Sequence, residues 1–235
     1  MLDIDVIILC GGQGSRLQEV VSDRPKPMAD INGRPFLSFL LDQLLASGFR
    51  EVILCTGYKG EQIEKTFGEL YKELVIKYSR ESKPLGTGGA IRQALSLVQT
   101  EAVMVMNGDS FIDANLSAYL AWYLENKHEA SLLLTYVPDT SRYGRVEADA
   151  NGCIIRFEEK GQGLGPGWIN AGVYLLRKSL LECIPSGKFF SLEREFFPDQ
   201  VNKGLYAYQC HGKFIDIGTP ESYASAERFF VGIGR

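Results

Sequence analysis

A glycine-rich loop beside two cationic residues is the strongest chemical signal in this chain of 235 residues. The loop, residues 11–14, follows the apolar run 6–10, which is typical of a buried parallel strand. Glycines there let backbone amides approach the oxygens of a ligand. Arg16 and Lys26 place two positive charges close to the loop in sequence. This combination predicts a binding site for a triphosphate.

The loop alone admits other interpretations. A tight structural turn uses the same residue types, and Rossmann dinucleotide loops carry a similar motif. The Rossmann interpretation fits poorly, because the spacing is not GxGxxG and no acidic residue ends the next strand, at 54–57. A Walker A loop is excluded, since no lysine followed by serine or threonine completes the motif.

Two aspartates are candidate ligands for Mg²⁺, which binds one or two carboxylates together with phosphate oxygens and water. Asp109 follows the apolar strand 102–106, and Asp216 lies between two isoleucines. Ligands of open α/β sheets bind at the carboxyl ends of the strands, so we expect both aspartates near the glycine loop. The alternative is that each caps a turn or a helix, and Asp216 precedes the last predicted helix.

Other polar segments suggest the rest of a site. Residues 85–90 form a second glycine-rich segment leading into a helix, where a flat base can lie against the backbone; a plain loop is the alternative. Lys160 can bind a second phosphate as a point charge, and Asn170 with a carboxylate can hold sugar hydroxyls. Taken singly, these are also ordinary turn or surface residues.

Strands and helices alternate through residue 138. The patterns predict strands at 6–10, 51–56, 75–79, 102–106 and 131–137, and helices at 36–47, 61–67, 90–98 and 116–125. Gly48 ends the first helix. This alternation predicts an α/β fold with a largely parallel sheet and helices on both faces.

The pattern changes after Pro138. A hairpin is predicted at 145–148 and 153–158, then a glycine-rich loop at 161–167, strands at 169–177, 205–210 and 213–217, and helices at 180–183, 191–202 and 221–230. Ser191 is the expected N-cap, with Phe196 and Phe197 facing the core. No linker is visible, so we expect one domain, 1–235, whose second half is an antiparallel extension packed on the first.

Composition excludes several classes. The net charge of −4, without a basic stripe, argues against nucleic-acid binding. No apolar run approaches the roughly 20 residues that span a bilayer, and the acidic N-terminus lacks a signal-peptide pattern. Five separated cysteines without CxxC spacing predict reduced thiols in a cytoplasmic protein. The two histidines have no partner at metal spacing, and the sequence leaves open whether the chain forms a homo-oligomer.

In their order along almost the whole chain, several motifs together resemble the sugar-1-phosphate nucleotidylyltransferases. They are residues 9–17 with Lys26-Pro27, 85–90, 107–109, 143–144, 157–160, 170–172 and 216–220. The resemblance implies a Rossmann-like, GT-A-like sheet flanked by helices, in which residues 1–138 mainly bind nucleotide and 139–235 mainly bind sugar phosphate. It also implies condensation of a nucleoside triphosphate with a sugar 1-phosphate, with Mg²⁺ and release of pyrophosphate.

The resemblance assigns roles by position. It makes Arg16 and Lys26 catalytic, and Asp109 and Asp216 metal ligands. It gives the nucleotide Leu9, Gly11, Gly12, Gly14, Ser15, Gly86, Thr87, Gly88 and Gly108, and the sugar phosphate Tyr143, Gly144, Glu158, Lys160, Asn170, Gly172 and Glu193. Cys10 departs from the alanine usual there, and its thiol is a candidate oxidation-sensitive group beside the nucleotide.

Within this family the chain resembles the guanylyltransferases of D-glycero-α-D-manno-heptose 1-phosphate, through residues 52–58, 84–90, 141–144 and 190–195. The implied substrates are GTP and that heptose phosphate, and the product serves surface polysaccharide synthesis. Mannose 1-phosphate or another nucleotide is the alternative, and Trp168 is a second candidate, beside Glu193, for the sugar pocket. Two other classes stay open: a non-catalytic nucleotide-sugar sensor, and a GT-A glycosyltransferase, whose DxD motif residues 109–113 do not supply.

Overall fold

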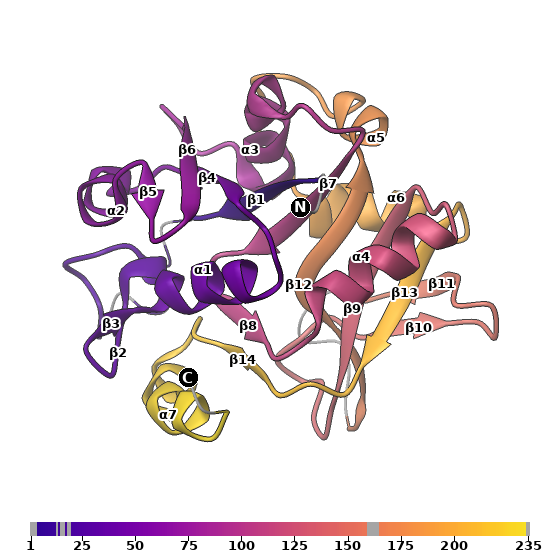
Figure 1. Ribbon diagram of the computed structural model, residues 1–235. Coiled ribbons are helices and arrows are strands. Elements are labelled where there is room, and N and C mark those ends of the chain that lie inside the picture. The colour runs from indigo at the N-terminus through magenta and orange to yellow at the C-terminus, as the bar shows by residue number, and fades with distance from the viewer. Residues whose placement is uncertain (1–3, 13, 15–16, 18–19, 159–164, 234–235) are drawn as a thin grey trace.

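A computed structural model describes residues 4–12, 14, 17, 20–158 and 165–233 of the chain. Its centre is an eight-stranded sheet in the order β13-β9-β12-β7-β1-β4-β6-β5 (Figure 1). Four strands of the first half are mutually parallel: β1 (Asp5–Leu9), β4 (Glu51–Thr56), β6 (Leu74–Arg80) and β7 (Ala102–Asn107). The predicted α/β fold with a largely parallel sheet is therefore confirmed.

The second half of the chain completes this same sheet. Strand β12 (Gly167–Arg177) lies between β7 and β9 (Ala130–Val137) and is antiparallel to both. Strand β13 (Leu205–Cys210) pairs in parallel with β9 at one edge, and β5 (Leu70–Tyr71) forms the other edge. The second half thus supplies the predicted antiparallel extension, and its long, mostly buried strand β12 lies inside the large sheet.

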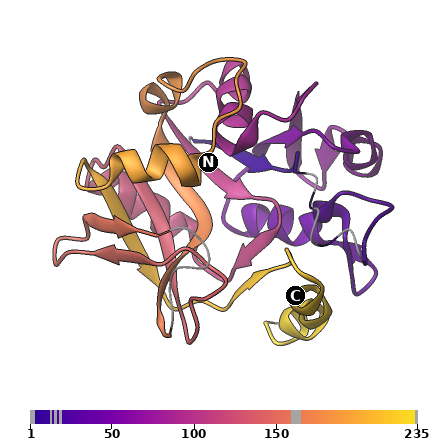
Figure 2. The same cartoon turned by 180° about the vertical axis from the view of Figure 1, so that it is seen from behind.

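Two hydrophobic clusters cover the two faces of the sheet. Along β1, Val6 and Ile8 point into one cluster and Ile7 into the other. The first cluster includes residues of α1 (Phe36–Ala46), α2 (Gly60–Phe67), α4 (Leu116–Glu125) and α7 (Pro220–Val231). The second includes residues of α3 (Gly86–Ala94), α5 (Lys178–Glu182) and α6 (Phe197–Gln200), seen from behind in Figure 2. In the described part of the chain, no helix has both the length and the apolar character needed to cross a membrane.

Three two-stranded sheets flank the large one. Strands β10 (Val146–Ala148) and β11 (Ile154–Phe157) form the predicted hairpin, and β2 (Asp30–Ile31) pairs with β3 (Arg34–Pro35). Strand β14 (Phe214–Asp216) pairs with β8 (Ser110–Ile112). Asp216 therefore ends a strand of a small separate sheet. This differs from the sequence-based expectation, which placed it at the carboxyl end of a strand of the large sheet.

Some element boundaries differ from the prediction. Helix α3 begins at Gly86, so the second glycine-rich segment is the first turn of the helix, which continues as the short 3-10 helix η2 (Leu95–Leu97). The predicted helix 191–202 is a π-helical segment, η3 (Leu192–Phe196), followed by α6. Ser191 caps it as predicted, since its hydroxyl accepts a hydrogen bond from the backbone of Arg194. Helix α7 is capped by Thr219 in a capping box, which excludes Asp216 as its cap.

Candidate active site

A pocket of about 960 Å³ brings together residues from both halves of the chain. It opens at the carboxyl ends of β1 and β7, where α/β sheets bind ligands. The predicted site residues that line it are Leu9, Gly11, Gly12, Gly14, Lys26, Gly86, Thr87, Asp109, Tyr143, Gly144, Glu158, Asn170, Gly172, Glu193 and Asp216. The topology thus gathers positions that lie as far apart as 9 and 216 in the sequence.

Five predicted site residues do not belong to this described lining. Ser15, Arg16 and Lys160 lie outside the described residues. Gly88 and Gly108 are described by the structure, but they are not among the described residues that line the pocket. Trp168 does not line it either and instead packs its ring against those of Tyr136 and His211, at centroid distances of 5.5 and 5.0 Å.

The glycines of α3 have a packing role that the sequence did not reveal. The backbone amides of Gly88 and Gly89 donate to the carbonyl oxygen of Phe190, at 2.9 and 3.2 Å. A Cβ atom on Gly89 would lie 2.6 Å from the carbonyl oxygen of Lys188, and one on Gly88 would lie 2.7 Å from the Phe190 ring. Because these two glycines lack side chains, the segment 188–190 can pack against the helix. Both of their amides donate hydrogen bonds to that segment.

Gly108 is explained in the same way. Its amide donates to the carbonyl oxygen of Leu9 at 3.0 Å, and a Cβ there would lie 2.5 Å from that oxygen. The glycine therefore lets the turn after β7 pack on the end of β1, beside the pocket wall.

Lys26 and Asp109 form an ion pair inside the pocket. The Lys26 ammonium is 3.2 Å from Oδ2 of Asp109, and the two side chains are 15% and 35% exposed. Lys26 opens the 3-10 helix η1 (Lys26–Met28), and its methylene groups pack on Gly14, where a Cβ would lie 2.6 Å from them. With φ at +65°, Gly14 needs both the small size and the backbone freedom of glycine.

The loop after β14 brings Asp216 to the same place. The backbone of Ile217 donates to the carbonyl oxygen of Asp109 at 2.9 Å, and Gly218 donates to Oδ1 of Asp216 at 2.6 Å. A Cβ on Gly218 would lie 2.5 Å from that Oδ1 and 3.5 Å from the ammonium of Lys26. The Lys26 ammonium is thus close to both aspartate-bearing segments.

Two carboxylates, those of Asp109 and Asp216, line the pocket near Lys26. Within the described ranges there is no group of three or more histidine, cysteine, aspartate or glutamate side chains able to hold a metal ion. Asp109 and Asp216 offer two carboxylates, and Mg²⁺ takes its remaining oxygens from phosphate and water.

Glu81 is a pocket residue that our sequence analysis missed. It follows β6, and its Oε2 accepts a hydrogen bond from the backbone of Leu85 at 2.9 Å. Its Oε1 lies close to Gly11, where it would clash with a Cβ atom. Burial raises the pKa of this carboxyl group above its usual range. The half-buried carboxyl group of Glu81 therefore lies in the pocket lining, between the glycine loop and α3. An acidic residue directly after a strand was the only available signal.

Two asparagines and a buried tyrosine form a second group that was missed in part. The side-chain amides of Asn107 and Asn170 donate to the Tyr174 hydroxyl, at 3.4 and 3.0 Å, and Asn170 accepts from the backbone of Gly172 at 2.8 Å. Burial raises the pKa of Tyr174 well above its usual range. Oδ1 of Asn107 is buried and has no hydrogen-bond partner among the described residues, although Asn107 lines the pocket. A ligand hydroxyl would satisfy it.

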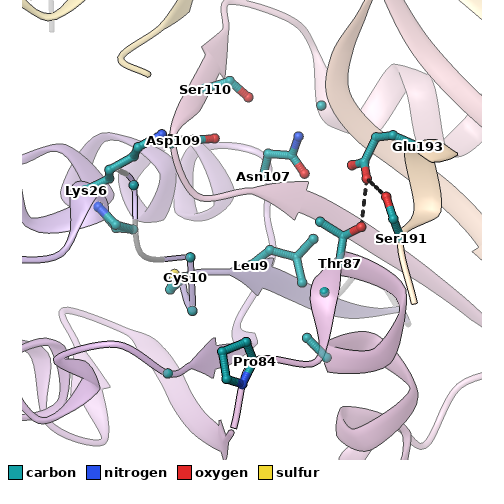
Figure 3. A pocket seen from close by; sticks show the side chains of 18 of the residues that line it. Leu9, Cys10, Lys26, Pro84, Thr87, Asn107, Asp109, Ser110, Ser191 and Glu193 are labelled. Atoms are coloured by element: carbon teal, nitrogen blue, oxygen red, sulfur yellow. Dashed lines mark hydrogen bonds and ion pairs between the residues drawn. The ribbon is translucent and has the colours of Figure 1, made fainter. Parts of the chain in front are cut away.

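Figure 3 shows how these groups divide the pocket. Lys26 and Asp109 lie at one side, Glu193 with Thr87 and Ser191 at the other, and Asn107 between them. One side therefore carries the Lys26 ammonium paired with the carboxylate of Asp109, and the other carries the carboxylate of Glu193.

Cys10 lies in the wall beside this site and is fully buried. Burial and the charge of Asp109 both raise the pKa of its thiol. The thiol is therefore protonated at neutral pH, which makes it a small apolar group and a poor target for oxidation.

The fold and the pocket define an α/β protein with a charged ligand site at the carboxyl ends of its central strands. The chain belongs to the nucleotidyl transferase family, whose model matches residues 5–231.

Individual relatives are similar over nearly their whole length. The chain is 44% identical to the D-glycero-alpha-D-manno-heptose 1-phosphate guanylyltransferase of Campylobacter jejuni, covering 94% of this chain and 97% of that protein. It is 39% identical to the protein of the same name from Aneurinibacillus thermoaerophilus, covering 96% and 97%. The crystal structure of HddC from Yersinia pseudotuberculosis complexed with GMP-PN superposes with a TM-score of 0.85, at 35% identity, over 97% of this chain and 99% of that one.

Proposed function

We propose that this protein is a guanylyltransferase that condenses GTP with D-glycero-α-D-manno-heptose 1-phosphate. The observation that carries the proposal is the end-to-end similarity to two enzymes of that name, in a chain whose pocket is lined by Lys26, Asp109 and Asp216. A phosphate oxygen of the sugar attacks the α-phosphorus of GTP. A new phosphorus–oxygen bond forms, the bond to the β-phosphate oxygen breaks, and pyrophosphate leaves with that electron pair.

The chemistry needs charge and position more than proton transfer. The attacking sugar phosphate is already an anion, so no general base is required. The barrier arises from bringing two anions together and from charge on the departing pyrophosphate. The Lys26 ammonium, held by Asp109 inside the pocket, stabilises that charge. Arg16 is the second cation that we assign to the triphosphate.

Asp109 and Asp216 are the residues that would hold Mg²⁺. When bound, the ion would add positive charge at the phosphate oxygens of GTP. Lys26 then has a different function in each state. In the free protein its ammonium neutralises the charge of Asp109, and in the complex it faces phosphate.

Guanine preference is supported by Glu81. Guanine presents two neighbouring N–H donors on its pairing edge, and a carboxylate accepts both. Adenine has an acceptor in place of the first donor, which would face the carboxylate unfavourably. Glu81 lies between Gly11 and Leu85, next to the first turn of α3, where we place the base.

The sugar phosphate is assigned to the part of the pocket that the second half of the chain lines. Tyr143, Gly144, Glu158, Asn170, Gly172 and Glu193 line this region, and Lys160 is the cation that we assign to the phosphate. A cytoplasmic location is supported by the cysteines, all five of which are free thiols.

Pyrophosphate release tests the proposal directly. The purified protein is incubated with Mg²⁺, GTP and a panel of sugar 1-phosphates, and the best sugar is repeated with ATP, CTP and UTP. Strong release with GTP and the heptose phosphate is the expected result. Release with mannose 1-phosphate or with another nucleotide would replace the substrate assignment, and no release with any pair would overturn the enzymatic proposal in favour of a sensor.

A further inference from the structure

A hydroxyl group on α3 holds the carboxylate of Glu193 on the other side of the pocket. The Thr87 hydroxyl donates to Oε2 of Glu193 at 2.7 Å (Figure 3). We propose that Thr87 is a positioning residue, which orients Glu193 to bind a hydroxyl of the sugar. This inference rests on the proposed function, and it separates Thr87 from the nucleotide-binding residues with which the family resemblance grouped it.

The hydroxyl of Thr87 is engaged in both directions. Its hydrogen goes to Glu193, while its oxygen accepts a hydrogen bond from the backbone of Leu192 at 2.8 Å. Its one hydrogen cannot be donated to a nucleotide at the same time. In this arrangement Thr87 acts on the pocket through Glu193.

The carboxylate of Glu193 is held by a second hydroxyl on the same oxygen. Ser191 donates to Oε2 at 3.0 Å, so both hydrogen bonds fix one oxygen of the carboxylate. Oε1 has no hydrogen-bond partner among the described residues, in a residue that lines the pocket. Two donors on one oxygen fix the direction of the other, and a preorganised acceptor binds a hydroxyl at a lower cost in side-chain entropy.

Charge indicates which substrate Glu193 serves. A carboxylate placed against the triphosphate would repel it, whereas sugar hydroxyls are neutral donors. In Figure 3, Glu193 lies on the side of the pocket away from Lys26 and Asp109, and Asn107 lies between the two sides. The neutral donors of guanine are already assigned to Glu81, so the sugar ring is the partner that we assign to Glu193 in the proposed reaction.

The surrounding backbone keeps the two elements in register. The carbonyl oxygen of Phe190 accepts hydrogen bonds from Gly88 and Gly89, one residue before Ser191. Glu193 itself is on the π-helical segment η3, a rare conformation that is frequent at functional sites. The segment that carries Glu193 is thus docked on the same turn of α3 that carries Thr87.

Steady-state kinetics of Thr87→Val test this assignment. Valine has nearly the same shape but no hydroxyl, so Glu193 loses its shorter hydrogen bond. We expect the KM for the sugar 1-phosphate to rise roughly tenfold or more, as is typical for a lost hydrogen bond to a charged group. The KM for GTP should change by less than about twofold. Thr87→Ser keeps the hydroxyl and should have the wild-type KM for the sugar 1-phosphate. Ser191→Ala removes the longer hydrogen bond and should raise this KM less than Thr87→Val does.

A double mutant separates positioning from general destabilisation. If Thr87 acts only through Glu193, adding Thr87→Val to Glu193→Gln should raise the sugar KM little further. A rise in the KM for GTP alone, or equal rises for both substrates, would overturn the inference. Thermal melting checks folding, and Thr87→Ala replaces Thr87→Val in the same comparison if the valine variant does not fold. Wild-type inactivity with every substrate pair would contradict the proposed function, whereas an active wild type with an unaffected Thr87→Val would contradict only this inference.

Discussion

The ammonium group of Lys26 lies 3.2 Å from the carboxylate of Asp109, although 83 positions separate the two residues in the chain. The pair joins the helix η1, which follows the glycine loop, to the end of β7. Because both residues line the pocket, a charged ligand that enters must rearrange or share this pair.

Replacing Lys26 by methionine should remove the charge while keeping the aliphatic stem that packs on Gly14. We expect kcat to fall by about 10²-fold or more, because the ammonium stabilises charge that develops in the transition state. Lys203→Met, at an exposed ion pair with Asp199, is the matched control and should behave as wild type. A normal kcat with a raised KM for GTP would instead assign Lys26 to ground-state binding.

The Asp109→Asn variant should respond weakly to Mg²⁺. The amide keeps the shape of the side chain but loses the charge that attracts the cation, so we expect the Mg²⁺ concentration for half-maximal rate to rise roughly tenfold or more. A Mg²⁺ titration of pyrophosphate release measures this. Asp199→Asn is the control, and an unchanged titration curve for Asp109→Asn would exclude the residue as a metal ligand.

The affinity for GTP should depend on the ionisation of Glu81. Burial raises the pKa of this carboxyl group, so in the free protein it stays protonated to a higher pH than an ordinary glutamate. Only the ionised form accepts both guanine donors, so the KM for GTP should be high below this pKa and fall as the pH rises through it. KM measured from about pH 5 to 8 checks the direction.

The Glu81→Gln variant is the companion to that pH series. We expect it to remove the pH dependence of the GTP KM and to reduce the preference for GTP over ATP by about tenfold or more, because one strong acceptor is lost. If the variant keeps the wild-type preference, guanine is recognised elsewhere in the pocket.

Gly89→Ala should destabilise the protein, although alanine is normally better than glycine inside a helix by about 1 kcal/mol. The new Cβ would lie 2.6 Å from the carbonyl oxygen of Lys188 and 3.0 Å from Leu85. We expect a net loss of about 1–3 kcal/mol, typical of overpacking, measured as a lower Tm. Gly232→Ala, at the end of α7 with contacts no closer than 3.4 Å, is the control and should leave the Tm unchanged or raised.

Cys10 should resist alkylation in the folded protein. Its thiol is fully buried, and its raised pKa keeps it from ionising at neutral pH. Labelling with iodoacetamide followed by peptide mass spectrometry should modify the exposed Cys183 and spare Cys10. Modification of Cys10 at the rate of Cys183 would support the alternative of an oxidation-sensitive site.

The elements that the sequence predicted best are apolar blocks bounded by turn residues. The strand at 51–56 and the helix at 116–125 begin and end where expected, since periodicity and local capping define them. The position of β12 between β7 and β9 was not predictable, because periodicity identifies a strand but not its neighbours. The helical start at Gly86 was missed because glycine disfavours helices, and here the contact with Phe190 overrides that preference.

The candidate site followed the same division. Residues in chemically distinctive motifs, such as Lys26 and Asp109, were identified and do meet in the pocket. Glu81 was missed because a single polar residue beside a strand carries no motif. Asn107 belongs to the motif 107–109 but was given no role of its own, and only the fold brings both side chains to one cavity. The partner of Thr87 was equally hidden, since Glu193 lies 106 positions away.

The insertion of β12 into the middle of the sheet has a consequence for how the chain acquires its structure. Until residues 167–177 have emerged from the ribosome, β7 lacks its neighbour on one side and β9 has no partner strand between it and the rest of the sheet. A fragment that stops at residue 138 would therefore carry the glycine loop and Lys26 on an unfinished sheet with an exposed apolar edge. The ability to bind a nucleotide should therefore appear late in synthesis, at the same time as the part of the pocket that faces the sugar.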